Sequence, residues 1–360
     1  MVPDKHGQDA TDGRAEAAIR ENFLGQADAC DRLGSPFTAH LCRALAKILD
    51  RTTQTGRLVL DWPGSAREDA LSLRLCGGLN QVVLRGADAE LARHYPPAAT
   101  DAAALTSALP GAIARNDAWL AASLRSPPQT NEIARSAVLY PGLMAIARKT
   151  GLPLHLNEIG SSAGLNLLLD RFAYDYGGET AGAAGAPVRL APELRGGRIP
   201  LSGRLEIVSR TGSDIAPVDF SQPAERLRLR SYVWPDQAAR LARLDAAIAL
   251  AEAEPYVLAR SDAADFVERR LESRPLDGAF VLMHSIMWQY LPEATRESVE
   301  TAMERAGRDA ARSAPVAWLR MEPLDIRDPH ATLSLTVWPD GVTRHLARCD
   351  FHGRWLDWTA

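Results

Sequence analysis

A carboxylate, two glycines and the small residues between them stand where a strand-like segment meets a helix-like one. The apolar segment 153–158 is typical of a buried strand, and it ends on Glu158. Gly160 and Gly164 enclose a turn of small residues, after which apolar residues recur at helical spacing. A strand, a glycine-bearing turn and a helix in this order can bring backbone N–H groups close to a ligand. Because a carboxylate there would repel a pyrophosphate, we expect a ligand with hydroxyl or ammonium donors.

Three ligand-binding patterns can be compared with residues 160–164, which we call the glycine turn. A dinucleotide-binding turn needs G-x-G-x-x-G, and Gly160, Ser161, Ser162 and Gly164 do not give that spacing. A Walker phosphate loop needs a lysine before Ser or Thr, and this turn has none. The acid-x-Gly-x-small-x-Gly turn of proteins that bind S-adenosylmethionine is similar, with Ser162 in place of its middle glycine. An ordinary strand-to-helix turn of an α/β protein is the alternative.

The composition of the chain is that of a globular protein, with 360 residues, 46% of them hydrophobic and 24% charged. The formal net charge of −4, without a Lys/Arg cluster, gives no strong nucleic-acid signal. The four cysteines lack C-x-x-C spacing, so we expect no metal site and no disulfide framework. The N-terminus lacks the apolar core of a signal peptide, and no apolar run approaches the ~20 residues of a membrane span. We therefore expect a cytoplasmic protein without a membrane partner, and its oligomeric state stays open.

Two regions of different hydrophobic periodicity follow a polar segment, 1–13, for which we expect a disordered tail. Residues 14–150 carry apolar residues at helical spacing and predict an all-helical N-terminal domain. From 151 to 360, strands and helices alternate, which is typical of a Rossmann-like parallel sheet. We also expect a hairpin insertion near 173–200 and a terminal hairpin with Asp340-Gly341 in its turn. The core strands predicted for this region are 153–158, 205–209, 256–259, 279–284 and 316–321.

Several segments spread over the chain resemble one uncharacterised bacterial family, the domain of unknown function 2332. They are TNEIARSA, LNEIGSSAGLNLLLDRFAYDYGG, VWPDQAARLARL, MHSIMWQYLP and HGRWLDW. This resemblance implies no particular activity. The C-terminal half is also similar to S-adenosylmethionine-dependent methyltransferases. That similarity implies an α/β fold with a seven-stranded sheet whose last strand is antiparallel, and S-adenosylmethionine as the cofactor.

The expected cofactor site follows from the rule that open α/β sheets bind ligands beyond the carboxyl ends of their strands. The methyltransferase resemblance implies an acid near the end of the second strand for the ribose hydroxyls, and Asp214 is the candidate. It also implies a polar residue after the third strand near the adenine, and Asp262 is the candidate. The whole expected set is Glu158, Gly160, Ser161, Ser162, Gly164, Asp214 and Asp262. Asp262 could equally cap the helix that follows it, and Glu158 could stabilise its own turn.

The acceptor side of the expected site begins at His284, which ends the fourth predicted strand. Histidine is suited to proton transfer near neutral pH, so His284 is our candidate for a catalytic base, although a single histidine is often structural. The other candidates for substrate binding are Asn131, Glu132, Arg135, Trp234, Asp236, Gln237, Trp288 and Tyr290. Those before His284 in the chain could instead form polar bonds between domains, and the two aromatic residues after it could belong to the core.

These expectations lead to one function hypothesis and two alternatives. The hypothesis is an S-adenosylmethionine-dependent methyltransferase that acts on a small-molecule acceptor. The first alternative is a non-catalytic scaffold or sensor that binds S-adenosylmethionine, which Ser162 in place of a glycine leaves open. The second is an NAD-dependent oxidoreductase, which the glycine spacing disfavours.

Overall fold

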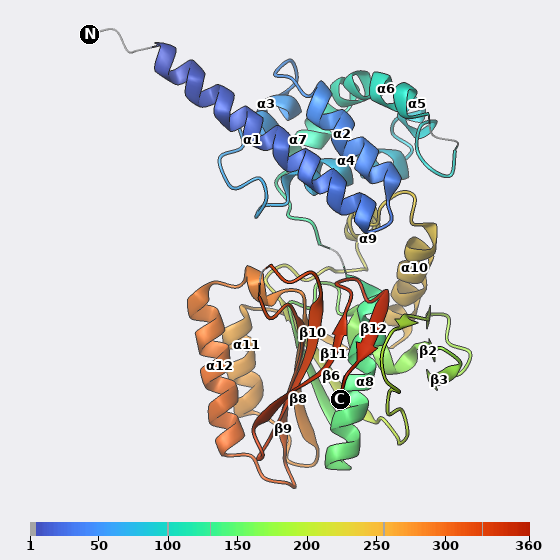
Figure 1. Ribbon diagram of the computed structural model, residues 1–360, viewed down its shortest axis with the longest axis vertical. Coiled ribbons are helices and arrows are strands. Elements are labelled where there is room, and N and C mark those ends of the chain that lie inside the picture. Colours follow the sequence, from blue (N-terminus) through green and yellow to red (C-terminus); the bar gives the residue numbers. More distant parts are fainter. Residues whose placement is uncertain (1–4, 99–100, 130, 255, 326) are drawn as a thin grey trace. The chain divides into compact units, whose positions relative to one another are not determined.

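The chain forms two compact units in the computed structural model, which describes residues 5–98, 101–129, 131–254, 256–325 and 327–360. Unit 1 comprises Met1–Thr130 and Ser221–Leu241, and unit 2 comprises Asn131–Phe220 and Ala242–Ala360. Figure 1 shows the helices of unit 1 and the large sheet of unit 2. The structure therefore confirms a mixed α/β protein with a helical N-terminal region. The first unit ends near residue 130, not 150, and it includes a later segment of the chain.

Unit 1 is helical throughout the part of it that the structure describes. Its first helix, α1, begins at Lys5, within the segment 1–13 for which we expect a disordered tail, and residues 1–4 lie outside the described part. The helices are α1 (Lys5–Arg32), α2 (Pro36–Ile48), α3 (Gln54–Leu60), α4 (Leu71–Leu84), α5 (Ala89–Ala92), α6 (Ala102–Arg115), α7 (Asp117–Ser123) and α9 (Pro223–Ser231).

The core of unit 1 forms where these helices bury their apolar stripes. In α2, Ser35 caps the helix by accepting a bond from the N–H of Thr38, and Pro36 occupies the first helical position. The apolar spacing of the helix then buries Leu41 and Leu45 among residues of α1 and α4.

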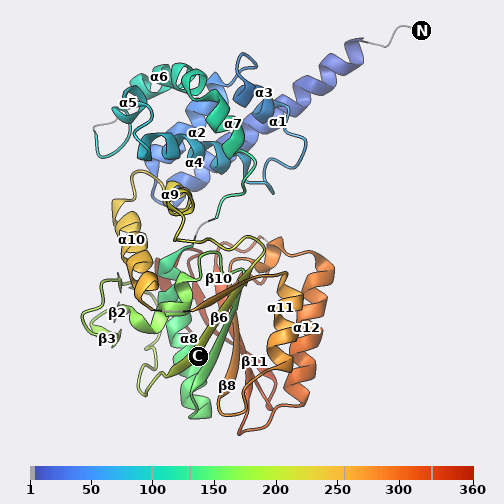
Figure 2. The same ribbon diagram turned by 180° about the vertical axis from the view of Figure 1, so that it is seen from behind.

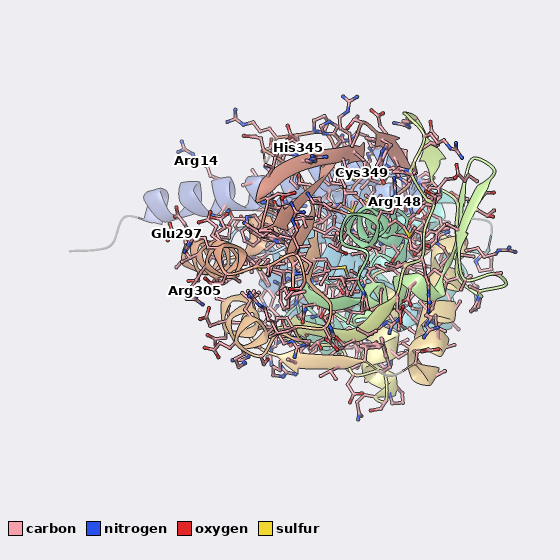
Figure 3. The ribbon with its side chains drawn as sticks, turned by 90° about the horizontal axis from the view of Figure 1, so that it is seen from below. Arg14, Arg148, Glu297, Arg305, His345 and Cys349 are labelled. Atoms are coloured by element: carbon pink, nitrogen blue, oxygen red, sulfur yellow. The ribbon has the colours of Figure 1, made fainter. Side chains whose placement is uncertain are left out.

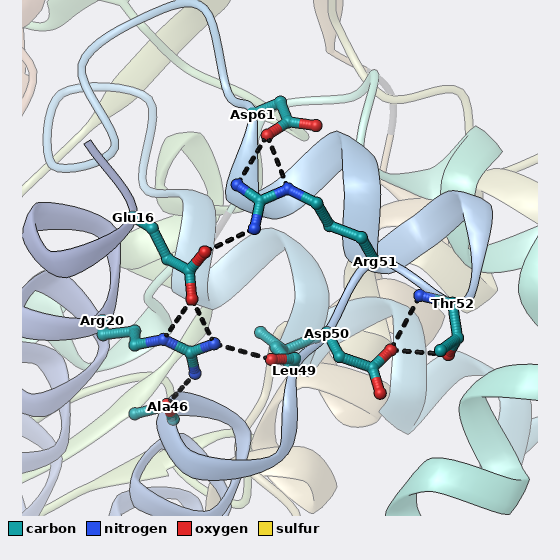
Figure 4. A network of polar contacts seen from close by, with 8 residues as sticks. All are labelled: Glu16, Arg20, Ala46, Leu49, Asp50, Arg51, Thr52 and Asp61. Carbon is teal, nitrogen blue, oxygen red and sulfur yellow. Dashed lines mark hydrogen bonds and ion pairs between the residues drawn. The ribbon is translucent and has the colours of Figure 1, made fainter. Parts of the chain in front are cut away.

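A polar network joins α1 to the segment after α2 at the edge of this core. Figure 4 shows Glu16 of α1 bonded to both Arg20 and Arg51. Arg20 also donates to the carbonyl oxygen of Leu49 at 2.7 Å, and Arg51 pairs with Asp61 at 2.9 Å. The guanidinium groups thus satisfy carbonyl and carboxylate groups close to where α2 ends.

Unit 2 is built on one nine-stranded sheet in the order β5-β12-β11-β10-β9-β8-β1-β6-β7. Five neighbouring strands, β7, β6, β1, β8 and β9, run parallel. The strands are β1 (Leu154–Ile159), β5 (Glu193–Leu194), β6 (Ile207–Asp214), β7 (Val257–Arg260), β8 (Ala279–Ser285), β9 (Val316–Glu322), β10 (Ala331–Trp338), β11 (Val342–Cys349) and β12 (Trp355–Trp358).

The far end of the sheet differs from the seven-stranded arrangement expected from the sequence. In that arrangement the last strand inserts antiparallel, whereas here β10, β11 and β12 follow β9 outward in chain order, each antiparallel to the one before it. Gly341, with φ of 70°, closes the short turn between β10 and β11 by bonding to Val337. Because so short a turn keeps its two strands adjacent, β11 cannot take a place on the far side of another strand.

A small second sheet and several helices complete unit 2. Residues 173–182 form the hairpin of β2 (Ala173–Tyr176) and β3 (Glu179–Gly182), and β4 (Arg189–Leu190) pairs with β2. The helices and 3-10 turns are η1 (Ile133–Arg135), α8 (Ser136–Thr150), η2 (Leu165–Arg171), α10 (Ala238–Ala253), α11 (Ala263–Glu272), η3 (Trp288–Tyr290) and α12 (Glu293–Arg308). The first four residues of α10 belong to unit 1 and the rest to unit 2.

Helices cover both faces of the parallel part of the sheet. Figures 1 and 2 show α11 and α12 on one face and α8 on the other. Gly142 lets α8 approach closely, since a Cβ there would lie 2.6 Å from a methyl carbon of Leu319 on β9. On α12, Val299 and Met303 are buried, while Figure 3 shows Glu297 and Arg305 on the outer side of the helix. Among the described helices, none is long and apolar enough to cross a membrane.

Candidate functional site

The strand order of unit 2 reverses between β1 and β8. From β1 the chain adds β6 and β7 on one side, then returns to add β8 and β9 on the other. Ligands of open α/β sheets bind beyond the carboxyl ends of the strands at such a reversal. Glu158 stands in register with Met283, so the two side chains share one face, and His284 points to the other. The candidate site is therefore the carboxyl edge around the ends of β1 and β8.

The glycine turn follows β1 and is fastened to the end of β6. The N–H and the hydroxyl of Ser161 both donate to the carbonyl oxygen of Ser213, at 3.0 and 3.1 Å. The N–H of Ser162 donates to Asp214 Oδ2 at 2.9 Å, and that of Gly164 to Ser161 at 2.7 Å. Several backbone donors that a ligand-binding turn would present are thus already bonded within the protein.

Both glycines of this turn make room for side chains of the protein. Gly160 has a φ of 63°, and a Cβ there would lie 2.8 Å from two carbons of Met287. Gly164 has a φ of 73°, and a Cβ there would lie 2.6 Å from the ring of Tyr256. The Tyr256 hydroxyl in turn donates to the carbonyl oxygen of Ala163 at 2.7 Å. The two glycines are therefore needed for the backbone conformation and for packing against these side chains. The sequence pattern predicted instead that they make room for a ligand.

The helix expected after the glycine turn is the short 3-10 helix η2, Leu165–Arg171. Its first N–H, that of Leu165, donates to Asn131 Oδ1 at 3.0 Å. Ser136 fixes the next residue by donating to Asn166 Oδ1 at 2.7 Å. A helix this short has little aligned dipole, so it adds little attraction for an anion.

Glu158 carries a buried carboxyl group at this site. It is 2% exposed, and its Oε2 has no hydrogen-bond partner among the described residues. Burial raises the pKa of Glu158 to about 8; Arg135 opposes this rise with its positive charge, and Asp214 adds to it with its negative charge. The carboxyl group is therefore mostly protonated at neutral pH, and a cation placed beside it would favour its ionised form.

The segment 131–135 belongs to this site. Arg135 donates to the carbonyl oxygen of Ser285, at the end of β8, at 3.1 Å. It also donates to the carbonyl oxygen of Phe351 at 3.0 Å, which joins the C-terminal turn to the same edge. Glu132 is buried and caps η1 by accepting from the N–H of Ala134 at 3.1 Å. The three candidates that the sequence offers in this segment, Asn131, Glu132 and Arg135, are thus all bonded to backbone groups.

His284 ends β8 on the other face of the sheet. Its Nδ1 lies 2.8 Å from Glu322 Oε1, and the same oxygen accepts from the N–H groups of Met287 at 3.1 Å and Trp288 at 3.4 Å. The histidine is fully buried, and Trp288 stacks on it with ring centroids 5.0 Å apart. Tyr290, in the same short η3 turn, is 69% exposed. The sequence analysis missed Glu322, although an acid at the end of a predicted strand is the signal that had singled out Glu158.

Asp214 and Asp262 both bond to the backbone. Asp214 accepts from Ser162 through Oδ2 and from the N–H of Ala216 through Oδ1, the latter at 2.9 Å. Asp262 caps α11 by accepting from the N–H of Ala264 at 2.8 Å. The first carboxylate thus holds the glycine turn, and the second has the capping role that the sequence left open.

Trp234, Asp236 and Gln237 lie in unit 1, where they fasten the segment 221–241 to the helices. Asp236 accepts from the N–H of Phe37 at 2.9 Å and from the hydroxyl of Ser35, at the start of α2. Gln237 donates to the carbonyl oxygen of Leu33 at 3.4 Å, and Trp234 packs against the helical core. Within the described residues, no group of three or more His, Cys, Asp or Glu side chains could hold a metal ion.

Comparison with protein families gives one match. Residues 20–358 match the family model described as an uncharacterised protein conserved in bacteria, DUF2332. No curated protein and no solved structure matches the chain.

Proposed function

The chain belongs to the DUF2332 family, and we propose that it is an S-adenosylmethionine-dependent methyltransferase acting on a small molecule. The observation that carries the proposal is Glu158, a buried carboxyl group with an unpartnered oxygen at the point where the strand order reverses. An unsatisfied buried polar atom in this place suggests a ligand group that completes its bonding.

The ammonium group of S-adenosylmethionine is a suitable partner for Glu158. It would provide both the hydrogen-bond donor that Oε2 lacks and the positive charge that stabilises an ionised carboxylate in a buried place. Glu158 thus accounts for binding of the ammonium end of S-adenosylmethionine. Asp214, which the resemblance implied for the ribose, already holds the backbone on both of its oxygens, so we assign it to the glycine turn.

The bound cofactor would supply a methyl group on a sulfonium, and the protein's part would be positioning. Methyl transfer is an in-line displacement, so catalysis depends mostly on holding the acceptor opposite the leaving sulfur. Glu158 would hold the ammonium, and Arg135 would fix the carboxyl edge through its bonds to Ser285 and Phe351. We assign the acceptor side to His284, near the end of the neighbouring strand β8, whose side chain points to the opposite face of the sheet from Glu158.

A non-catalytic S-adenosylmethionine-binding protein is the second candidate. The observation that favours it is the glycine turn, whose donors are bonded within the protein and whose glycines make room for Met287 and Tyr256. Such a turn offers a cofactor fewer free backbone donors and less room, so we expect weaker binding. A sensor needs only enough affinity to respond to the ligand.

Calorimetry on the full chain at pH 8 tests the proposal, with S-adenosylmethionine, S-adenosylhomocysteine and NAD as ligands. We expect micromolar affinity for both sulfur ligands and weaker binding of NAD. Glu158→Gln should weaken their binding about ten- to hundredfold, because a charge-assisted bond contributes roughly 1.5–3 kcal/mol. Asp277→Asn, an exposed carboxylate bonded to His155 near the start of β1, is the control and should bind as the wild type does. Absence of heat with both sulfur ligands, or tighter NAD binding, would remove the proposal.

Binding alone would not separate the two candidates. Incubation with S-adenosylmethionine and an extract of small metabolites, followed by mass spectrometry, does so. Methylated product points to the transferase, and tight binding without any transfer points to the sensor.

A further inference from the structure

We infer that His284 and Glu322 form a proton-accepting pair, and that the acceptor substrate is a small, flat molecule with a phenol-like hydroxyl group. The inference rests on the proposed methyl transfer and deepens it. In this pair Glu322 is the positioning residue, and His284 takes the proton.

The geometry of the pair fixes which nitrogen of His284 can act as the base. Glu322 Oε1 lies 2.8 Å from Nδ1, so a neutral imidazole carries its proton on Nδ1, where it donates to the carboxylate. Nε2 then has a free lone pair, and it has no hydrogen-bond partner among the described residues. A buried nitrogen without a partner destabilises the protein, and a bonding group of a substrate would recover that loss.

Within the described part of the chain, His284 is the one ionisable side chain that pairs with Glu322. Glu322 is 8% exposed, and the second oxygen, Oε2, also lacks a partner within the described residues. Arg320, next to His284 in the register of β8 and β9, lies over the ring of Trp318 and donates to Thr336 at 3.2 Å. The carboxylate therefore faces the imidazole, as in the histidine–acid pairs that act as bases in other enzymes.

The turn after His284 is held in a strained conformation by the same carboxylate. Ile286 has a φ of 51°, which is rare for a β-branched residue. Oε1 of Glu322 accepts from the N–H groups of the next two residues, Met287 and Trp288, and so keeps this turn in place. Backbone strain that the surroundings maintain is concentrated at functional sites.

The surroundings of His284 suit a flat, apolar molecule. Trp288 stacks on the imidazole, and Trp318 lies with its ring centroid 6.0 Å from it. Of these neighbours Trp288 is the more exposed, being half-buried at the start of the short η3 turn, whereas Trp318 is 4% exposed. A substrate would reach Nε2 by displacing Trp288. Its ring would then lie beside the imidazole and Trp318, in aromatic surroundings.

Acid–base chemistry limits which class of hydroxyl group the acceptor substrate can carry. A neutral imidazole can accept a proton from a phenol, whose pKa is about 10. An aliphatic hydroxyl is, like water, a far weaker acid and would give up its proton to an imidazole much less readily. A histidine that accepts the proton itself is thus matched to a phenolic hydroxyl.

The reaction balances without any further reactant. The phenolic oxygen forms a bond to the methyl carbon as its proton passes to His284 Nε2. The carbon–sulfur bond breaks, and its electron pair stays on sulfur. The products are the methyl ether, the sulfide form of the cofactor and an imidazolium paired with Glu322, which then releases its proton to water.

NMR of the full chain labelled with nitrogen-15 in its histidines tests the pair without any cofactor. His284→Gln assigns the resonances. We expect Nδ1 protonated and Nε2 unprotonated in the neutral ring. Glu322→Gln retains an oxygen that can hold the turn, but its amide can also donate to Nδ1, so more of the neutral ring should carry its proton on Nε2 than in the wild type. A neutral ring protonated on Nε2 in the wild type, or a tautomer population that Glu322→Gln leaves unchanged, would overturn the inference.

Asp277→Asn is the matched control, because Asp277 Oδ1 lies 3.1 Å from Nε2 of another buried histidine, His155. It should change the ring nitrogen resonances of His155 and leave those of His284 as they are. A change at His284 in this variant as large as that in Glu322→Gln would mean that the shift does not come from the pair, and the inference would fall.

Phenol and anisole, as probes, test the acceptor class. They share a ring and differ in the hydroxyl proton, so phenol should shift the Nε2 resonance of His284 and anisole should not. Equal shifts with both probes, or none with either, would exclude a phenolic acceptor. Calorimetry with the cofactor separates the two proposals. If the cofactor binds but the NMR results contradict the pair, the proposed function stands alone. If the NMR results support the pair but no cofactor binds, the methyl transfer is excluded, and the phenolic acceptor with it.

Discussion

The Oδ2 atom of Asp214 accepts a hydrogen bond from the backbone N–H of Ser162 at 2.9 Å. The two residues are 52 positions apart in the sequence, and the bond joins the end of β6 to the middle of the glycine turn. Ser162 has a φ of 52°, which is uncommon for a residue with a side chain. The bond thus holds a backbone conformation that the turn would not readily adopt alone.

Asp214→Asn should therefore destabilise the protein. The asparagine retains one oxygen but presents an N–H₂ group to one of the two backbone donors and loses the charge. A bond to a charged group contributes roughly 1.5–3 kcal/mol, so we expect a loss of about that size in the free energy of unfolding. Urea denaturation measures it. Asp262→Asn is the control, because asparagine caps a helix about as well as aspartate, and equal losses in the two variants would contradict this account.

Glu158→Gln should change how stability depends on pH. The folded protein holds a proton on Glu158 up to about pH 8, whereas the unfolded chain releases it near the ordinary value of 4.5. Between these values the wild type loses stability as pH rises, by up to roughly 1.4 kcal/mol per pH unit. Glutamine does not ionise, so the variant should gain on the wild type steadily from pH 5 to pH 8. Denaturation curves across that range measure the gain, and a difference that stays constant with pH would show that Glu158 does not titrate in this way.

Gly164→Ala should cost more stability than Gly151→Ala. Both residues have positive φ, 73° and 69°, so alanine is strained at each, by roughly 1–2 kcal/mol. A Cβ on Gly151 would meet nothing within 4 Å, whereas one on Gly164 would press on Tyr256 at 2.6 Å. We expect a further loss of about 1–3 kcal/mol at Gly164 from overpacking, measured by urea denaturation. If the two losses are equal, Tyr256 moves aside freely.

Asp236→Asn should destabilise unit 1 and leave cofactor binding as it is. The carboxylate accepts from Ser35 and from the N–H of Phe37, so losing its charge should reduce the free energy of unfolding by roughly 1.5–3 kcal/mol. Asp31→Asn, in an exposed ion pair with Arg43, is the control and should change it by less than about 1 kcal/mol. Calorimetry on Asp236→Asn then tests the substrate-binding role expected from the sequence: weaker ligand binding at unchanged stability would support that role against the structural one.

Much of the parallel sheet could be predicted because its strands are apolar runs bounded by turn residues. The strands expected at 279–284 and 316–321 are those of β8 and β9 within one residue. The second strand was expected at 205–209 and is β6, Ile207–Asp214. The second half of β6 consists of polar residues and a glycine, so the apolar pattern ends before the strand does. Asp214 consequently ends the strand, whereas the predicted strand stopped at residue 209.

The bonding within the site could not be predicted, because it depends on residues distant in sequence. Glu158 was recognisable as an acid at the end of a strand, but its missing partner is visible only when its neighbours are known. Nothing in the sequence connects His284 with Glu322, which are 38 positions apart. The helix expected after the glycine turn has the right apolar spacing. A tighter 3-10 helix forms there, in which the N–H of Leu165 donates to Asn131 and the carbonyl oxygen of Leu167 accepts from Arg210.

The assignment of Ser221–Leu241 to unit 1 determines how this protein can be dissected. A gene fragment ending at codon 130 would encode most of the helices but lack α9, Asp236 and the carbonyl groups of Ser231 and Val233, to which Asn80 donates. The complementary fragment would carry that stretch with no helices to receive it. Expression of either half alone should give poorly folded material, whereas a design that rejoins residue 129 to residue 221 through a short linker would retain every segment of the first unit.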